Sequence, residues 1–370
     1  MPDDLAPRTS SRRTFLKQAG SALAIGAVGA PAVLLPRRQA PVGVALCGLG
    51  TYSTTQLAPA LQDTEHCALR GIVTGSPEKI PRWQRQYDIP DRNVYSYETL
   101  PDIANNDDID VVYIVTPPGV HARDAIKAAD AGKHVWCEKP MAMDEAECQS
   151  IMDAADRNGV QLTVGYRLQH EPNNRTIMRY AREQTYGAVT TVRTGAGYSG
   201  AHPDPDDWRR DPDLGGGALY DMGVYPINAA RYATGMEPIA VKGRLWSERD
   251  EMYSEVPEFA TFELRFPDGI TARGETSFGK ATNYLDVECT DGSYQLRPFQ
   301  TYSGVRGRTS DGTRLPPAGG DQQARQMDND ARALRDGTAP IVPGSEGLAD
   351  IQIVRAIMKS SESGEAWVKM

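Results

Sequence analysis

Short apolar segments alternate with helix-like segments in the first half of this chain, and this alternation limits its possible folds more than any other feature. The first apolar segment, PVGVALCGLG at residues 41–50, runs directly into glycines. The helix-like and strand-like segments that follow alternate in this order: 54–62, 67–75, 76–87, 109–118, 119–132, 133–140, 144–159 and 160–167. Strands that alternate with helices through short links form βαβ units around a parallel sheet. We therefore expect an α/β domain with a parallel sheet over residues 41–165.

The pattern changes after residue 166, where strand-like segments follow one another. A helix-like segment at 173–187 comes first. The strand-like segments after it are 189–198, 239–247, 259–269, 270–279 and 284–298. The sequences PDG and TDG within them are typical of hairpin turns, which favour an antiparallel sheet. Helix-like segments at 319–336 and 345–360 close the chain. We expect residues 166–370 to form an α+β domain, with helices on one side of a large, open, mostly antiparallel sheet.

Paired arginines precede a mild apolar segment near the N-terminus. The sequence SRRTFLK, residues 11–17, is followed by a Gly- and Ala-rich run that ends near Leu35. This pattern predicts a twin-arginine signal or N-terminal arm over residues 1–40, export machinery as a partner, and a periplasmic or secreted protein. A membrane helix is the alternative, although the run is short and poor in Leu and Ile. Small residues around Pro31 leave the cleavage site open, and an uncleaved arm is one possibility.

The charge of the chain changes once this segment is set aside. The whole chain has a formal net charge of −9, and residues 1–40 hold six Lys and Arg but two Asp and Glu, so the remainder carries −13. An acidic body argues against nucleic acid and anionic membranes as partners. The five cysteines show no metal-ligand spacing, and we expect buried, inert thiols rather than disulfides or a nucleophile. No metal site is expected.

The sequence GLGTYS directly follows the first strand-like segment. In a dinucleotide-binding (Rossmann) fold the first glycine forms a tight turn, the second lets a pyrophosphate approach the backbone, and the next helix offers N–H donors. Ser53 replaces the third glycine of the usual motif, so a purely structural turn is the alternative. The residues expected at the cofactor are Gly48, Leu49, Gly50, Thr51 and Tyr52.

The end of the second strand bears on the choice of cofactor. Sites for NAD usually place a carboxylate there, but this chain has Thr74, Gly75 and Ser76, with Lys79 one turn later. Hydroxyls, a helix N-terminus and a lysine suit the 2′-phosphate of NADP. We therefore expect NADP, with NAD the less favoured cofactor. The alternative is an ordinary turn with a solvated lysine.

Two further motifs end buried strands at the edge where ligands of open α/β sheets bind. The motif TPPGVH supplies Thr116, Pro117, Pro118 and His121. A histidine at such a helix start is more often structural than catalytic. The motif WCEKP supplies Glu138 and Lys139, and this lysine either reaches solvent or points into the cleft.

The segment LGGGALYDMGVYPINAARYATG, residues 214–235, carries a carboxylate and a phenol four residues apart. Asp221 and Tyr225 lie on one face of a helix, behind glycines that allow close approach to another group. A phenol has a pKa of about 10, and a nearby ammonium lowers it by stabilising the phenolate. Lys139, Asp221 and Tyr225 would then form a catalytic set for alcohol oxidation. The alternative is that Asp221 caps the helix and Tyr225 packs on the sheet.

In this order and spacing, GLGTYS, TPPGVHA, EKPMAM, VGYR and GGGALYDMGVYPINAARY resemble the glucose–fructose oxidoreductase / inositol dehydrogenase / rhizopine catabolism (Gfo/Idh/MocA) family. The resemblance runs from about residue 42 to the C-terminus and is greatest to the glucose–fructose oxidoreductase branch. It implies that Lys139 is the catalytic lysine, Asp221 orients a sugar, and Tyr225 is the acid/base. It also implies that Arg167, Trp208 and Arg209 lie near the cofactor or sugar, and that the second sheet mediates assembly. Two departures, the Asn missing after TP and Thr74 in place of Ser, imply altered affinity.

These features together predict an exported NADP-dependent sugar oxidoreductase that converts an aldose at C1 to its lactone. A tightly held cofactor would be reoxidised by a second sugar or carbonyl compound. The chain would assemble as a homo-oligomer, a dimer or a tetramer. The alternatives are an exported NAD-dependent glycoside hydrolase of the same family, which would release an aglycone without net oxidation, and a non-catalytic sugar-binding protein.

Overall fold

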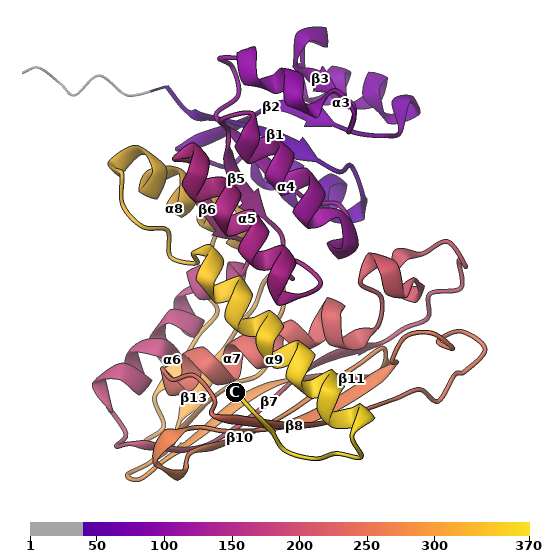
Figure 1. Cartoon of the computed structure of the whole chain (residues 1–370). Coiled ribbons are helices and arrows are strands. Elements are labelled where there is room, and N and C mark those ends of the chain that lie inside the picture. Colours follow the sequence, from indigo (N-terminus) through magenta and orange to yellow (C-terminus); the bar gives the residue numbers. More distant parts are fainter. Residues whose placement is uncertain (1–39) are drawn as a thin grey trace, which may run out of the picture. The chain divides into compact units, whose positions relative to one another are not determined.

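The computed structural model describes residues 40–370, and residues 41–370 form one compact unit with a sheet in each of two lobes (Figure 1). The expected twin-arginine signal lies outside the described residues. Among residues 40–370, no helix combines the length and apolar character that crossing a bilayer would require.

The first lobe contains a six-stranded sheet in the order β3-β2-β1-β4-β5-β6, and every strand pair in it is parallel. This confirms the expected α/β architecture. The two-residue strand β3 was not expected, because so short a strand leaves no periodic signal. The strands are β1 (Val42–Cys47), β2 (Cys67–Val73), β3 (Val94–Tyr95), β4 (Val111–Ile114), β5 (His134–Cys137) and β6 (Leu162–Val164).

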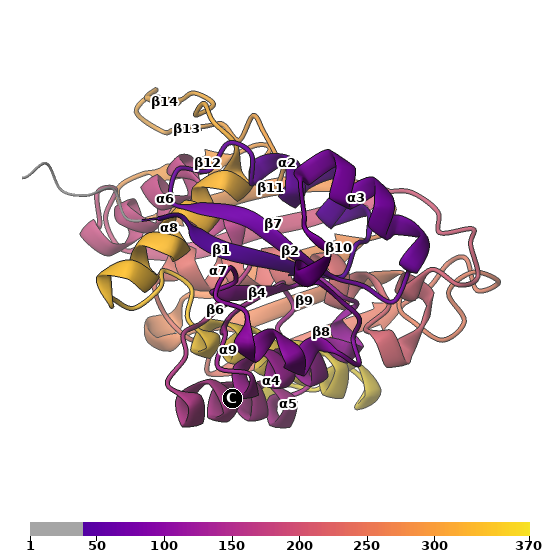
Figure 2. The ribbon, with the colours of Figure 1, turned by 90° about the horizontal axis from the view of Figure 1, so that it is seen from above.

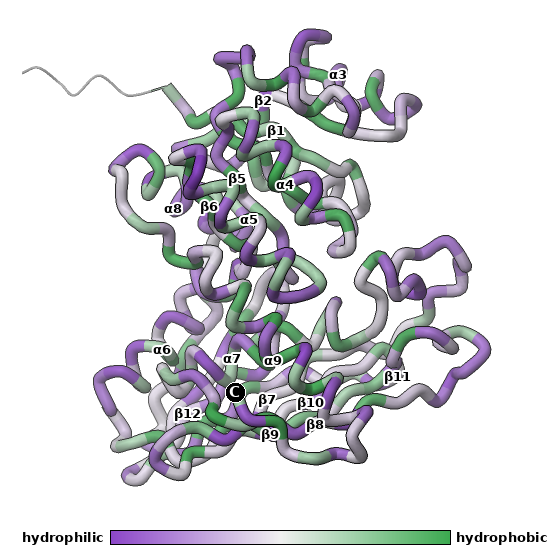
Figure 3. Tube along the Cα trace, viewed as in Figure 1, coloured by the Kyte–Doolittle hydropathy of each residue, from purple (hydrophilic) through white to green (hydrophobic). Residues whose placement is uncertain are grey.

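Helices cover both faces of this sheet, which explains why all six residues of β1 are apolar or glycine and buried. One face packs against α4 (His121–Asp130) and α5 (Glu145–Asn158). The other face packs against the helical turns η1 (Ser53–Leu57) and α2 (Ala58–Ala60), and against α3 (Ile80–Tyr87) and α8 (Gln322–Asp336). Hydrophobic residues accordingly follow the strands of this lobe (Figure 3).

Helix α8 comes from the far end of the chain yet lies beside β1 and β2 (Figure 2). Its Ala324, Met327 and Ala331 belong to the same apolar cluster as Val44 and Leu46 of β1. The first lobe is therefore completed by a helix from the second half of the chain. The division at residue 165 does not separate the two lobes fully, and it stays a prediction as a domain boundary.

The second lobe contains a nine-stranded sheet in the order β14-β13-β12-β11-β7-β10-β9-β8-β15. All its pairs are antiparallel except β7 with β10, which confirms the expected mostly antiparallel sheet. The PDG sequence joins β9 to β10 and the TDG sequence joins β11 to β12. The strands are β7 (Val189–Ser199), β8 (Ala240–Trp246), β9 (Phe259–Arg265), β10 (Thr271–Ser277), β11 (Gly279–Cys289), β12 (Ser293–Leu296), β13 (Gly307–Thr309), β14 (Arg314–Leu315) and β15 (Val368–Lys369).

Three helices lie on the face of this sheet that is turned toward the first lobe, as expected for an α+β domain (Figure 1). They are α6 (Pro172–Glu183), α7 (Val224–Thr234) and α9 (Gly344–Glu362). Every residue of α7 is buried, because the helix lies between the sheet and the other helices. Asp221 and Tyr225 therefore stand at the start of a helix that is enclosed on all sides.

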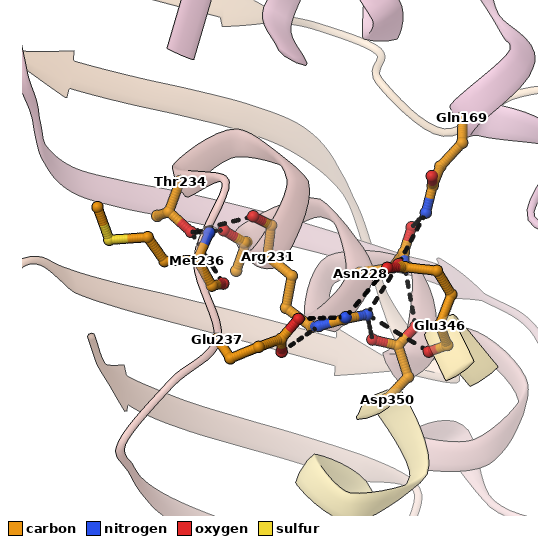
Figure 4. Close-up of polar contacts among 9 residues, drawn as sticks. Gln169, Asn228, Arg231, Thr234, Met236, Glu237, Glu346 and Asp350 are labelled. Carbon is orange, nitrogen blue, oxygen red and sulfur yellow. Dashed lines mark hydrogen bonds and ion pairs between the residues drawn. The ribbon is translucent and has the colours of Figure 1, made fainter. Parts of the chain in front are cut away.

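A buried guanidinium fixes α7 to α9 (Figure 4). Arg231 on α7 donates from Nη1 to Asp350 Oδ1 at 2.8 Å and to Glu346 Oε2 at 3.1 Å. Its Nη2 donates to Glu237 Oε1 at 2.5 Å, just beyond the helix end. The neighbouring Asn228 donates to Asp350 Oδ2 at 2.9 Å. These bonds hold α7, and hence Asp221 and Tyr225, in a defined position.

Candidate active site

A cleft of about 720 Å³ lies at the carboxyl ends of the strands of the first sheet and is closed from the other side by residues of the second lobe. Ligands of open α/β sheets bind at this edge. Nearly all the predicted cofactor residues and all three predicted catalytic residues line it: Gly48, Leu49, Gly50, Thr51, Tyr52, Thr74, Ser76, Lys79, Thr116, Pro117, Pro118, His121, Glu138, Lys139, Trp208, Arg209, Asp221 and Tyr225.

The glycine turn after β1 has the room that a pyrophosphate needs. Gly48 has φ +101°, a conformation that favours glycine, and Ser53 Oγ donates to its carbonyl at 2.5 Å. A Cβ added to Gly50 would meet no atom within 4 Å, so the backbone there faces open space. Ser53 thus replaces the third glycine without filling the turn, and the residues present fit a dinucleotide.

The tip of β2 presents hydroxyls and one lysine to the cleft. Thr74 Oγ1 accepts from the backbone N–H of Ser76 at 3.0 Å, and Lys79 Nζ donates to the carbonyl of Leu49 at 3.1 Å. Lys79 is thereby held beside the glycine turn. Gly75, which was expected at the cofactor, does not line the cleft: a Cβ on it would lie 2.9 Å from the ring of Tyr97.

Lys139 follows β5 in the first lobe and reaches across to the second lobe. Its Nζ donates to the backbone carbonyl of Asp221 at 2.7 Å and lies 3.6 Å from Asp221 Oδ1. The Lys139 side chain is 12% exposed, so it points into the cleft rather than into solvent. This resolves the alternative that the sequence left open.

Asp221 is an ionised carboxylate held between two cations. Its Oδ2 accepts from Arg209 Nε at 2.9 Å. Burial raises the pKa of this carboxyl, but Lys139 and Arg209 outweigh burial and hold the pKa below its usual value. Asp221 does not cap α7, because the N-cap of that helix is Gly223 and no side chain caps it. The helix-cap alternative is therefore wrong.

Tyr225 lies one residue into α7 and is 6% exposed. Lys139 Nζ lies 4.8 Å from the centre of the Tyr225 ring, and Arg167 Cζ lies 5.3 Å from the same point. The ring belongs to the main apolar core and also lines the cleft, so the packing and the catalytic interpretations are compatible. The expected meeting of ammonium, carboxylate and phenol is present.

Two helices beside the cleft contain a π-helical turn near their start, Ser53–Leu57 after the glycine turn and Leu219–Gly223 before α7 (η9). Such turns are rare and occur often at functional sites. The second of them contains Asp221. A π-helical turn is wider than an α-helical turn, so side chains four residues apart do not align across it as they do in a regular helix.

His121 and Glu138 bind neighbouring parts of the chain. The two ring nitrogens of His121 lie 2.7 Å from the carbonyl of Thr116 and 2.9 Å from that of Pro140, so the ring ties the two strand-end loops together. Glu138 accepts from the hydroxyl of Tyr113 at 2.7 Å, and burial raises the pKa of its carboxyl. These contacts favour a supporting role for His121, in line with the structural alternative.

The five cysteines, all within the described residues, are free. Four of them, Cys47, Cys67, Cys137 and Cys148, are buried, and burial raises the pKa of each thiol. These four thiols are buried, as expected, whereas Cys289 is half-buried.

Two family models match the chain in the order of its lobes. The first, described as an oxidoreductase family with an NAD-binding Rossmann fold, covers residues 42–166. The second, the GFO/IDH/MocA C-terminal domain, covers residues 174–295. The chain belongs to the GFO/IDH/MocA family. This confirms the resemblance and identifies the chain as an oxidoreductase.

Relatives of this GFO/IDH/MocA member include sugar dehydrogenases. A D-xylose 1-dehydrogenase [NADP(+)] of Haloarcula marismortui is 29% identical over 87% of this chain and 92% of the relative. A D-xylose 1-dehydrogenase (NADP(+)) of Haloferax volcanii is 32% identical over 86% and 96%. Among solved structures, the aldose-aldose oxidoreductase of Caulobacter crescentus has a TM-score of 0.85 and 36% identity over 90% of this chain and all of that chain.

Two further residues of this GFO/IDH/MocA member lie at the cleft, one behind its wall and one, which was not predicted, on the wall itself. Arg167, expected near the cofactor or sugar, lies directly behind the cleft: it is fully buried, and its Cζ lies 5.3 Å from the ring of Tyr225 and 4.8 Å from that of Tyr302. Tyr302, which was not predicted, does line the cleft, and its ring stacks on Tyr52 at 6.0 Å. Tyr302 lies in a loop between β12 and β13, where no periodicity or motif could have indicated it.

Proposed function

We propose that this GFO/IDH/MocA member oxidises an aldose at C1 to the lactone, with NADP as the hydride acceptor. One observation carries the proposal. The ammonium of Lys139 lies 4.8 Å from the ring of Tyr225 in a cleft that also contains the open glycine turn. A base for a hydroxyl proton and a groove for a dinucleotide are the two parts that such a reaction requires.

The roles of the chain's own residues follow from their positions. Tyr225, as phenolate, takes the proton of the C1 hydroxyl, and Lys139 stabilises that phenolate by its charge. The Asp221 carboxylate accepts a hydrogen bond from a sugar hydroxyl and holds the ring in place. Bound NADP supplies the nicotinamide carbon that accepts the hydride from C1. The lactone then leaves, and the proton passes from Tyr225 to solvent.

The choice of NADP over NAD rests on Lys79, Thr74 and Ser76 at the cleft wall and on the NADP named for the two xylose dehydrogenases. Lys79→Ala should weaken NADP binding by about tenfold or more, because a charged hydrogen bond to phosphate contributes roughly 1.5–3 kcal/mol. Binding of NAD should change little. Titration of both nucleotides measures this, with Lys242→Ala on the second sheet as the control. Equal weakening of both nucleotides would reject the assignment of Lys79 to the 2′-phosphate.

The export signal expected before residue 40 leads to a further part of the proposal. An exported enzyme meets little free NADP, so the cofactor is folded into the protein before export and stays bound. A second sugar or carbonyl compound then accepts the hydride back in a ping-pong cycle.

The test is to denature the purified exported protein and identify the nucleotide that it releases. We expect NADP or NADPH, and a panel of aldoses should reduce the bound cofactor in a single turnover, as followed at the nicotinamide absorbance. Protein that lacks NADP(H) and still turns over sugars would reject the trapped cofactor. Release of an aglycone without net oxidation would instead support a glycoside hydrolase.

A further inference from the structure

A continuous set of polar contacts connects His202 to the proposed catalytic residues. The ring of His202 lies between two groups: its Nε2 is 2.7 Å from the hydroxyl of Tyr198, and its Nδ1 is 3.0 Å from Asp207 Oδ2. Burial lowers the pKa of the His202 imidazole, so the ring is neutral at neutral pH. The neutral tautomer that satisfies both contacts accepts from Tyr198 at Nε2 and donates from Nδ1 to Asp207.

The contacts continue from Asp207 to the cleft. Asp207 Oδ1 accepts from the backbone N–H of Arg209 at 3.0 Å and from its Nη1 at 3.4 Å. Arg209 Nε in turn donates to Asp221 Oδ2 at 2.9 Å, and Asp221 Oδ1 lies 3.6 Å from Lys139 Nζ. Asp207 thus contacts His202 with one oxygen and Arg209 with the other, and Asp221 contacts Arg209 with one oxygen and Lys139 with the other. The orientation of Arg209 depends on both.

His202 also packs against three aromatic rings and so connects the segment that carries Arg209 to the second lobe. Its ring lies 4.9 Å from the ring of Phe278, 5.9 Å from that of Tyr198 and 6.3 Å from that of Tyr253. Residues 200–214 form two short 3₁₀ turns, Trp208–Arg210 (η7) and Pro212–Leu214 (η8), and otherwise no regular structure. Six residues of this segment line the cleft: Asp204, Asp206, Asp207, Trp208, Arg209 and Leu214.

We propose that His202 is a positioning residue for the sugar: through Asp207 it sets the guanidinium of Arg209 against Asp221. This inference rests on the proposed function, because it assumes that Asp221 and Arg209 bind the sugar. Without the imidazole, Asp207 Oδ2 loses its partner, so the carboxylate that helps to orient Arg209 is held less firmly. The nucleotide side of the cleft, which the first lobe supplies, is unaffected.

The decisive variants separate the packing of His202 from its hydrogen bonds. His202→Phe keeps a ring between Phe278 and Tyr198 but removes both polar contacts, whereas His202→Asn retains an amide donor where Nδ1 stands. We expect His202→Phe to raise the KM for the sugar by about tenfold or more, with kcat within about threefold and the bound nucleotide unchanged. His202→Asn should restore most of the affinity. His66→Phe in the first lobe is the control.

A double variant tests whether His202 acts through Arg209. In an Arg209→Met background, His202→Phe should raise the KM no further, because the group that it positions is gone. If the two effects multiply, or if folded His202→Phe has the KM of the unaltered protein, the proposal is wrong. Should His202→Phe fail to fold, Asp207→Asn weakens the next contact and is judged by the same criteria. Unaltered protein that holds no nucleotide and oxidises no sugar would reject the proposed function itself.

Discussion

At the scale of single residues, removal of the Tyr225 hydroxyl should lower the catalytic rate more than any other change to a single group. Tyr225→Phe keeps the buried ring between Lys139 and Arg167 but removes the proposed proton acceptor. Because general acid–base catalysis contributes roughly 10²–10⁴-fold, we expect kcat to fall by about that factor. Nucleotide content and stability should stay as they are. Steady-state sugar oxidation measures the effect, with Tyr87→Phe on α3 as the control, and a variant with full activity would exclude Tyr225 as the base.

The carboxylate of Asp221 should affect stability in a pH-dependent way. Its pKa in the folded protein lies below the ordinary value of about 3.9, so its ionised form stabilises the fold above about pH 4. That stabilisation is lost as the pH falls through the folded-state pKa. We expect Asp221→Asn to lower the free energy of unfolding by a constant amount between about pH 5 and pH 8. The difference from the unaltered protein should shrink below about pH 4, and urea unfolding at several pH values measures it. A difference that grows on acidification would contradict the assignment.

The predicted residues that lie at the cleft are those whose chemistry and position depend on their neighbours in the sequence. Lys139, at a strand end, lines the cleft as expected. Asp221 and Tyr225, four residues apart, line it too. Gly75 does not line the cleft, and the ring of Tyr97 lies against it, a contact between positions that no local pattern connects. Tyr302 was missed for the same reason, since it reaches the cleft only through the fold of its loop.

At the scale of elements, α7 carries the proposed catalytic tyrosine near its N-terminal end and is bound to α9 near its C-terminal end, through Arg231. Arg231→Met would leave Asp350 buried without its cation, and breaking a buried ion pair costs about 3–5 kcal/mol of stability. Arg157→Met, which removes an exposed ion pair with Asp130, is the matched control and should cost at most about 1 kcal/mol. Denaturant unfolding compares the two. Similar losses for both variants would show that the cluster on α9 does not anchor α7.

The helical elements also show what periodicity can and cannot predict. The expected strand-like and helix-like segments correspond to the observed ones within a few residues, because apolar alternation and turn residues act over short distances. The π-helical turns at Ser53–Leu57 and Leu219–Gly223 were not expected. Each of these turns spans only five residues, which is too short a stretch to show a periodic pattern of its own.

At the scale of the whole molecule, the outer face of the second sheet has no helix among the described residues to cover it (Figure 1). Charged side chains of neighbouring strands form ion pairs there; Arg273 Nε, for example, lies 3.5 Å from Glu263 Oε1. We propose this face as the homo-oligomer contact that the family resemblance implies. In a twofold contact each residue occurs twice, so Arg273→Glu should shift the protein toward monomer. Light scattering measures this, with Arg157→Glu in the first lobe as the control. An unaltered protein that is monomeric at all concentrations would exclude the contact.

The sequence by itself determined the parts of this protein that depend on neighbouring residues: the alternation that builds a parallel sheet, the hairpins of the second sheet, the glycine turn, and the residue types at the strand ends. Only the tertiary structure decided which of these parts meet. Lys139 and Asp221 are 82 residues apart, and α8 returns to the first lobe from the end of the chain. Contacts over such separations arise from the packing of whole lobes, and their energy is spread over many side chains, so no local stretch of sequence encodes them.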